Sequence, residues 1–178
     1  MIRYASASGH SGFVSDFAMA IIGIVAVDRN LAIGKGGTLP WHYSSDLKFF
    51  KQTTVGKAVV MGRRTWQSLK KPLPDRLNVV LTTSTEIEAV DSVVRLPDVA
   101  SVLTLAQTLT SDLFVIGGAK TYEAFMPHLD QWIVTEIPLS VEDADTFVPS
   151  NFLDGFELSE LRQLDEELRV KFFARARR

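Results

Sequence analysis

The chain has 178 residues, of which 46% are apolar, so it is long enough to form one domain with a full hydrophobic core. Nineteen basic and 21 acidic residues leave a net charge of −2, which gives no surplus for binding nucleic acid or an anionic membrane and favours a small-molecule partner. The absence of cysteine excludes disulfides, thiolate nucleophiles and cysteine–zinc sites, and it agrees with a reducing cytoplasm.

The first twenty residues are rich in Ser, Gly and Ala and lack the continuous apolar centre of a secretory signal. No apolar run elsewhere approaches the length of a membrane span. We expect residues 1–20 to be a flexible extension or the product of an upstream start codon, with Met19 as a candidate native first residue. Residues 21–178 are expected to form the domain.

Short runs rich in Val and Ile predict strands over residues 21–27, 57–61, 77–83, 112–117 and 131–137. They are mostly apolar without alternation, which is typical of central strands that are covered on both faces. Helical patterns lie between them, at residues 44–53, 64–69, 98–108 and 119–126. This alternation predicts an α/β fold with a central, mostly parallel sheet flanked by helices.

The C-terminal part of the chain predicts an antiparallel hairpin at the edge of this sheet, formed by residues 156–161 and 168–176. The stretch QLDEELRVKFF, residues 163–173, which overlaps the second of these strands, can also be interpreted as a helix. The hairpin is favoured because Val170, Phe172 and Phe173 prefer extended structure.

One charged residue stands out in the stretch TLPWHYSSDLKFFKQ, where Asp46 lies close to aromatic side chains. A carboxylate that loses hydration there calls for a cationic or amidine-like partner. The alternative is that Ser44 or Ser45 caps a helix whose first turn carries the acid. From this stretch alone, capping is the better interpretation.

Two predicted strands run through glycine into a helix that opens with a cation, at residues 62–65 (GRRT) and 117–121 (GGAKT). A helix N-terminus offers free N–H groups and partial positive charge, and glycine lets a ligand approach the backbone. In parallel sheets such junctions share one edge, where ligands bind. The pair favours a phosphorylated ligand such as a dinucleotide, although the glycines could also serve only tight turns.

Other site templates are absent. The stretch IGKGGTL has Leu39 where a Rossmann fingerprint needs its third glycine, and VGKA lacks the flanking residues of a P-loop. The histidines show no metal-ligand spacing, so no metal is expected, and there is no G-x-S-x-G nucleophile motif.

Taken in order, the stretches IVAVDRNLAIGKGGTLPW, VVMGRRTWQSL, PLPDRLNVVLT, VIGGAKTYEAF, TEI and ADTFVP, together with Asp46 and Phe50, resemble the dihydrofolate reductases. The resemblance extends from Ile21 to about Arg175. It implies a cytoplasmic, monomeric enzyme of one-carbon metabolism that reduces dihydrofolate to tetrahydrofolate with NADPH and binds antifolates. The hydride goes to C6 and the proton to N5 of the pterin.

The resemblance also answers the question raised by Asp46, whose carboxylate would hold the 2-amino group and N3 of the pterin. Its charge would favour the protonated pterin while water delivers the proton. The residues implied as catalytic are Asp46, Trp41, Tyr122 and Thr135. Those implied to bind substrate are Ile24, Val25, Asp46, Leu47, Phe50, Leu69, Leu73, Arg76, Ile116 and Thr135, with Arg76 holding the glutamate α-carboxylate.

For NADPH, the resemblance implies contacts along the same edge of the sheet, with residues 34–41 as a mobile lid. The phosphates would meet Arg63, Arg64, Thr65, Thr83 and Lys120. The remaining implied contacts are Ala26, Ile33, Gly34, Leu39, Gly62, Leu81, Thr82, Gly117, Gly118, Ala119, Thr121 and Tyr122.

The chain departs from the family pattern at Gln67, where many relatives have Glu, and at Asp75, where Gly is common before Arg76. Asp75 must therefore tolerate the turn geometry that places the arginine. Two other functions were weighed: an NADPH-dependent reductase of a pyrimidine intermediate in riboflavin synthesis, and a catalytically silent dinucleotide-binding protein. Asp46 and Arg76 in their folate motifs argue against the first, and a carboxylate facing an aromatic slot argues against the second.

Overall fold

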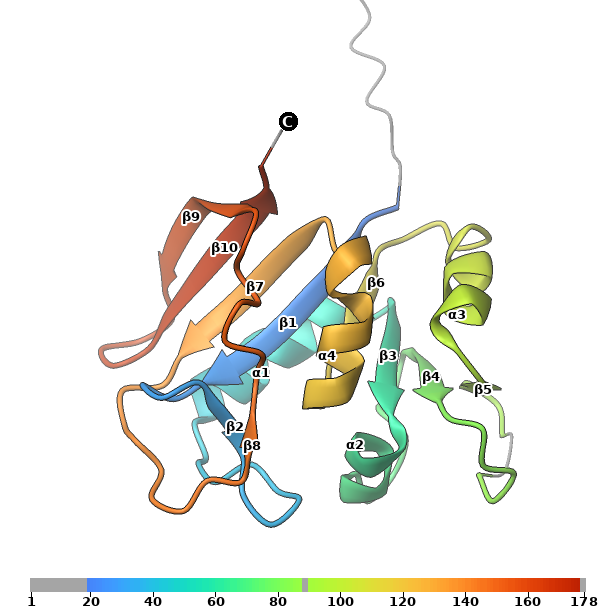
Figure 1. Ribbon diagram of the computed structural model, residues 1–178, viewed down its shortest axis with the longest axis horizontal. Helices are drawn as coiled ribbons and strands as arrows, with labels where there is room; N and C mark the ends of the chain where they lie inside the picture. The colour runs from blue at the N-terminus through green and yellow to red at the C-terminus, as the bar shows by residue number, and fades with distance from the viewer. Residues whose placement is uncertain (1–18, 88–89, 177–178) are drawn as a thin grey trace, which may run out of the picture.

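The computed structural model describes residues 19–87 and 90–176, so the expectation of a flexible extension falls almost entirely on residues 1–18, outside the described part. The described chain forms an eight-stranded sheet in the order β5-β4-β3-β6-β1-β7-β10-β9 (Figure 1). Its strands are β1 (Ile21–Val27), β3 (Ala58–Gly62), β4 (Leu77–Leu81), β5 (Val93–Leu96), β6 (Leu113–Val115), β7 (Gln131–Glu136), β9 (Phe156–Gln163) and β10 (Arg169–Arg175). A second, two-stranded sheet pairs β2 (Ala32–Gly34) with β8 (Thr146–Phe147).

The predicted fold class is confirmed. From β5 to β7 every neighbouring pair of strands is parallel, and β10 and β9 add an antiparallel edge. The C-terminal segment is therefore the predicted hairpin and not a helix. β1 lies in the middle of the sheet, hydrogen-bonded to β6 on one side and to β7 on the other.

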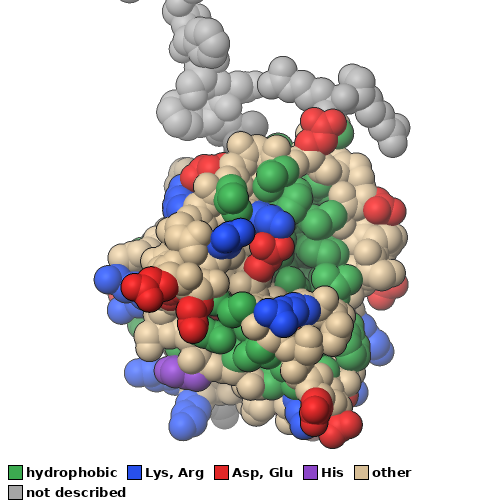
Figure 2. Space-filling model, turned by 90° about the vertical axis from the view of Figure 1, so that its left-hand side faces the viewer, with side chains coloured by type: hydrophobic (Ala, Val, Ile, Leu, Met, Phe, Trp, Pro, Cys, Tyr) green, Lys and Arg blue, Asp and Glu red, His purple; other side chains and the backbone are tan. Residues whose placement is uncertain are grey.

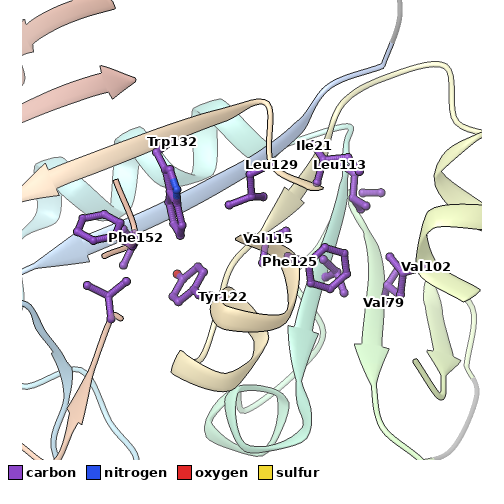
Figure 3. Packing of buried hydrophobic residues seen from close by; sticks show 14 of the residues in the cluster. Ile21, Val79, Val102, Leu113, Val115, Tyr122, Phe125, Leu129, Trp132 and Phe152 are labelled. Carbon is purple, nitrogen blue, oxygen red and sulfur yellow. The ribbon is translucent and has the colours of Figure 1, made fainter. Parts of the chain in front are cut away.

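Helices cover both faces of the sheet: α1 (Ser44–Thr54), α2 (Arg63–Ser68), α3 (Val99–Ala106) and α4 (Ala119–Phe125), the last followed by a short 3₁₀ turn at Met126–His128. Val102 of α3 and Phe125 of α4 are fully buried in one apolar cluster, which Figure 3 shows from close by. Phe49 of α1 and Trp66 of α2 pack in a second cluster on the opposite face. No helix of the described chain has the length and apolar character that crossing a bilayer requires.

Three short strands were not predicted from the sequence: β2, β5 and β8. β2 and β8 have three and two residues, too few for a periodic pattern, and they pair only with each other. β5 is an edge strand with mixed exposure, so its four residues carry no continuous apolar signal. The strand predicted over 77–83 ends at Leu81. The helix predicted over 98–108 spans Val99–Ala106. It begins at Val99 because the Asp98 carboxylate caps it by accepting from the Ser101 N–H at 2.7 Å.

The β9–β10 edge is well solvated. Figure 2 shows acidic and basic side chains side by side at the centre of this face, with apolar side chains around them. Ion pairs join Arg162 to Glu160 and Lys171 to Glu136, while Leu158 and Leu161 are exposed. Charges on an edge strand oppose pairing with a second chain.

Candidate active site

The carboxyl ends of β1, β3, β6 and β7 meet at one edge of the sheet and bring the two strand–helix junctions together. β3 and β6 are parallel neighbours, and the Gly62 N–H donates to the Gly117 carbonyl at 2.9 Å. A Cβ on Gly62 would lie 2.6 Å from the Thr121 hydroxyl oxygen, so only glycine permits this approach. The functional side chains are arranged around this edge.

Asp46 lies in the first turn of α1, partly buried. Burial raises the pKa of its carboxyl, and a hydrogen bond with the Thr135 side chain opposes that rise. Thr135 is itself buried on β7, directly opposite Ala26 of β1 in the strand register. Among the described residues no cation forms an ion pair with this carboxylate, as expected of a site for a cationic or amidine-like ligand.

The capping interpretation of the serines is wrong. α1 begins at Ser44, and its N-cap residue is Tyr43, which makes no side-chain capping hydrogen bond. Both serines therefore lie inside the first turn, where their hydroxyls cannot serve as the N-cap. Capping does not account for Asp46 here.

Arg76 is buried at the end of the segment that precedes β4. Its Nε donates to the Pro74 carbonyl at 2.9 Å, and its Nη1 donates to the Thr54 hydroxyl at 3.1 Å. The guanidinium carbon lies 5.9 Å from the ring centroid of Phe50, one turn along α1 from Asp46. Burial lowers the pKa of Arg76, while the Asp75 carboxylate opposes that change. The guanidinium is thus held through its Nε and Nη1 atoms, and its remaining N–H groups can bind an anion.

Asp75 does adopt the turn geometry that the position demands. Its φ is +59°, in the left-handed region where Asp is one of the few tolerated residues other than Gly. Its carbonyl accepts from the Gly56 N–H at 2.7 Å, which fixes the turn against the end of α1.

Tyr122 closes the other side of the edge. Its hydroxyl donates to the Ile24 carbonyl at 2.7 Å, across 98 positions of sequence. Burial first, and the nearby charge of Asp46 second, raise the pKa of Tyr122 well above its ordinary value. The phenol therefore remains a hydrogen-bond donor at every physiological pH.

The segment 34–41 is anchored to residues 142–146, where the Lys35 ammonium donates to the Glu142 carbonyl at 3.0 Å and Gly34 pairs with Thr146. The Asp145 carboxylate accepts from the Gly36 N–H at 2.7 Å, and this bond is the main reason why the pKa of Asp145 is lowered. Within the segment, Lys35 and Thr38 exchange backbone hydrogen bonds of 3.0 and 3.1 Å. The indole nitrogen of Trp41 is buried, and no group of the described chain accepts its hydrogen bond. A bound molecule or water at this point could accept a hydrogen bond from the indole N–H of Trp41.

The phosphate side is open and basic. Arg63, Arg64 and Lys120 are exposed at the starts of α2 and α4, while the Thr65 hydroxyl lies 3.5 Å from the position a Cβ on Gly118 would take. Cations, free helix N–H groups and a backbone that approaches closely at glycine fit the polyphosphate of a dinucleotide.

The residues implied for the site differ in exposure. Buried ones are Ile24, Val25, Gly34, Arg76, Gly117, Thr121, Tyr122 and Thr135. Partly buried ones are Ala26, Ile33, Trp41, Asp46, Phe50, Gly62, Thr65, Leu69, Leu73, Leu81, Thr82, Ile116, Gly118 and Ala119. Exposed ones are Leu39, Leu47, Arg63, Arg64, Thr83 and Lys120. Two surface cavities, of about 400 and 540 Å³, contain neither Asp46 nor Tyr122. We call the sheet edge around Asp46, Tyr122 and Arg76 the groove.

Two residues that sequence analysis missed organise the loops of this groove. The fully buried Asn78 side chain accepts from the Leu73 N–H and donates to the carbonyls of Leu73 and Arg76, all at 3.0 Å. The Asp28 carboxylate accepts from the N–H groups of Ala32 and Val141, both at 2.8 Å. A single polar residue at the centre of an apolar strand, as Asn78 is in LNVVL, is the signal that could have revealed the first.

Comparison with known proteins places this geometry in context. Residues 20–176 match the family model described as dihydrofolate reductase. The chain is 34% identical over 148 residues to the dihydrofolate reductase of Haemophilus influenzae, covering 82% of this chain and 90% of that protein. It is 40% identical over 131 residues to the dihydrofolate reductase of Neisseria meningitidis serogroup A, covering 71% and 77%.

A solved structure is similar throughout. It is the dihydrofolate reductase of Enterococcus faecalis complexed with NADP(H) and RAB-propyl, with 30% sequence identity and a TM-score of 0.81. The superposition covers 89% of this chain and 98% of that one.

Proposed function

The chain belongs to the dihydrofolate reductase family and is an NADPH-dependent oxidoreductase that reduces dihydrofolate to tetrahydrofolate; from this premise we propose which of its residues do the work. The observation that carries the proposal is Asp46, a partly buried carboxylate in the first turn of α1, whose pKa is raised by burial against the opposing effect of the Thr135 side chain. We assign to this carboxylate the amidine edge of the pterin, its 2-amino group and N3. A planar N–C–N edge gives a carboxylate two parallel, charge-assisted hydrogen bonds, which orient the ring as well as hold it.

Bound NADPH supplies the hydride that reaches C6 of the pterin. Asp46 favours the protonated pterin through its negative charge, while water delivers the proton to N5. Tyr122 remains protonated and engages the Ile24 carbonyl, so it keeps that strand end in place without competing for the proton. The free indole N–H of Trp41 is a donor for the water that the reaction needs.

Arg76 supplies the contact to the far end of the substrate. Its Nε and Nη1 are engaged by Pro74 and Thr54, so the guanidinium is held in one orientation before the ligand arrives. We propose that its remaining N–H groups bind the glutamate α-carboxylate. Phe50, Leu69 and Leu73, all partly buried, supply apolar surface for the aminobenzoyl group between the two charged ends.

For NADPH we propose that Arg63, Arg64 and Lys120 bind the phosphates, including the 2′-phosphate that distinguishes it from NADH. Their exposure at two helix starts supports this, since phosphate binding needs charge that a ligand can reach. Gly117 and Gly118 lie beside Tyr122, where the nicotinamide end is proposed to bind. Antifolates of the diaminopyrimidine class, which carry the same amidine edge, are proposed to compete at Asp46.

Replacing Asp46 tests the assignment. In D46N the amide cannot carry the charge that favours the protonated pterin, so turnover near neutral pH should fall strongly, by about 100-fold or more. NADPH binding, followed by quenching of protein fluorescence, should be unchanged.

The control is D154N, an exposed aspartate distant from the groove, which should keep full activity. The assay is the loss of NADPH absorbance on addition of dihydrofolate, with and without a diaminopyrimidine antifolate. If D46N turns over at the rate of the unaltered enzyme, the assignment of Asp46 fails.

Three further proposals concern the domain bounds, the oligomeric state and the cellular location. The family match begins at residue 20, which supports a domain over residues 21–178 and an extension before it. The charged β9 edge supports a monomer. The absence of cysteine supports a cytoplasmic location.

A further inference from the structure

Gly23 and Trp132 form a cross-strand pair at the centre of the sheet. Gly23 of β1 lies opposite Trp132 of β7 in the parallel register, and the indole is fully buried over it. A Cβ on Gly23 would lie 2.4 Å from Cε3 and 2.5 Å from Cζ3 of the indole, closer than real atoms approach. The glycine is therefore required by the volume of the ring and not by a turn.

The indole that packs over Gly23 also packs against the Tyr122 ring. Figure 3 shows Trp132 projecting from β7 towards α4, with Phe152 on one side and Tyr122 beneath it. The ring centroids of Trp132 and Tyr122 are 5.3 Å apart, and those of Trp132 and Phe152 are 5.2 Å apart in an edge-to-face arrangement. Gly117 lies on the groove side, where a Cβ would be 3.4 Å from the Tyr122 ring. The phenol is thus enclosed between Trp132, Gly117 and the Ile24 carbonyl.

The indole nitrogen of Trp132 has no hydrogen-bond acceptor within the described chain, although the side chain is fully buried. An unpaired buried donor costs stability. An apolar residue would avoid that cost, so the tryptophan is explained by its shape. The shape matters most at Tyr122, whose hydroxyl donates to the Ile24 carbonyl at the edge of the groove.

We propose that Trp132 is a positioning residue for the reduction: it fills the space that Gly23 leaves and holds the Tyr122 ring in place, with the Tyr122 hydroxyl on the Ile24 carbonyl. This inference rests on the proposed role of Tyr122 at the reacting rings. Trp132 is fully buried, so no ligand can contact it directly, and it lies on the opposite face of the sheet from Phe50, in the cluster that contains Tyr122. Its loss should therefore slow the chemical step and leave ligand binding nearly intact.

The primary test is W132L, measured by single-turnover hydride transfer. The smaller side chain lets Tyr122 move back from the groove, so the rate should fall about tenfold, while KM for dihydrofolate and for NADPH should change less than about threefold. The matched control is V102A, a fully buried truncation in the same apolar cluster on α3, which should lower the melting temperature without slowing hydride transfer. Equal rates in the two variants would overturn the proposal.

A reciprocal exchange makes the test specific. In the double variant G23L/W132L, the volume removed from β7 is returned from β1, and the hydride-transfer rate should recover to within about threefold of the unaltered enzyme. Recovery of the melting temperature without recovery of the rate would overturn the proposal. If W132L does not fold, W132F removes less volume and should slow hydride transfer by about threefold.

Tyr122→Phe separates this inference from the proposed function. If Y122F slows hydride transfer but W132L does not, the positioning role fails and the role of Tyr122 stands. If Y122F leaves the rate unchanged, the proposed role of Tyr122 fails, and the positioning role of Trp132 fails as a consequence. If both hold, W132L should have little further effect in the Y122F background, because the two changes act through one side chain.

Discussion

Asp46 illustrates how a single side chain can serve the reaction at the expense of the fold. Burial raises the pKa of its carboxyl, so the folded protein holds protons there more tightly than the unfolded chain does. For a carboxyl shifted in this direction, stability is lost as pH rises from the unfolded pKa of about 3.9 through the folded pKa. An acid whose pKa is lowered on folding makes the protein more stable as pH rises over this range, so the pH dependence caused by Asp46 has the opposite sign.

D46N should therefore be more stable than the unaltered enzyme at pH 7, although it is far less active. The difference in melting temperature should shrink as pH falls through the raised folded pKa towards about 4, and below that it should stay small because the carboxyl is then protonated in both the folded and the unfolded chain. Thermal denaturation at several pH values measures this. A D46N variant that melts below the unaltered enzyme at neutral pH would show that the carboxylate is stabilising, against the pKa direction given above.

Arg76 provides a second test at the scale of one residue. R76K keeps the charge but loses both anchoring hydrogen bonds and the two-pronged geometry that suits a carboxylate. KM for dihydrofolate should rise by about 10- to 100-fold, with little change in kcat at saturation or in KM for NADPH.

A dihydropteridine substrate without the glutamate tail supplies the control for R76K, since the variant and the unaltered enzyme should then have similar KM values. A comparable loss with the tail-free substrate would mean that Arg76 supports the groove and does not bind the carboxylate.

Sequence alone located the charged groups of the site but could not give their surroundings. Asp46 and its aromatic neighbours raised the question from the residues, and only the family resemblance supplied a role. Capping by Ser44 or Ser45 was a reasonable local interpretation that failed because the N-cap is Tyr43, one residue before Ser44 and two before Ser45. The environment of Asn78 could not be foreseen, because its partners come from loop geometry that no local pattern encodes.

At the scale of elements, long apolar strands and the C-terminal hairpin were predictable because each has enough residues to show its period. The short pair β2 and β8 was not, yet it shapes the groove. Their two-stranded sheet brings the start of segment 34–41 beside residues 145–147, and Asp145 then accepts from Gly36. Elements of two or three residues are set by such tertiary contacts and not by propensity.

D145A should release this anchor. Segment 34–41 would then sample open arrangements more often, so trypsin should cleave after the exposed Lys35 faster, and hydride transfer should slow by about three- to tenfold. D145N, whose amide oxygen can still accept from the Gly36 N–H, should lie between D145A and the unaltered enzyme. Equal cleavage rates in all three proteins would mean that the segment is held by other contacts.

At the scale of the whole molecule, the buried residues of both apolar clusters and every residue assigned to the site lie within residues 20–176, the range of the family match, and Met19 packs against the first cluster. A chain that starts at Met19 should therefore keep the melting temperature, kcat and KM of the full-length chain, and both should elute as monomers by light scattering. Loss of activity or stability on removal of residues 1–18 would assign a role to the extension. A dimer in either form would contradict the proposed assembly.

The central place of β1 bears on how the chain is made. Ile21 pairs with Leu113 in β6 and Val27 pairs with Glu136 in β7, so the ribosome completes the first neighbour of β1 only after about two thirds of the chain and the second after about three quarters. Throughout that interval the nascent chain carries an apolar strand with nothing to pair with. Such a high contact order predicts slow folding after release and makes the newborn enzyme a natural client of chaperones that shield exposed β-strands.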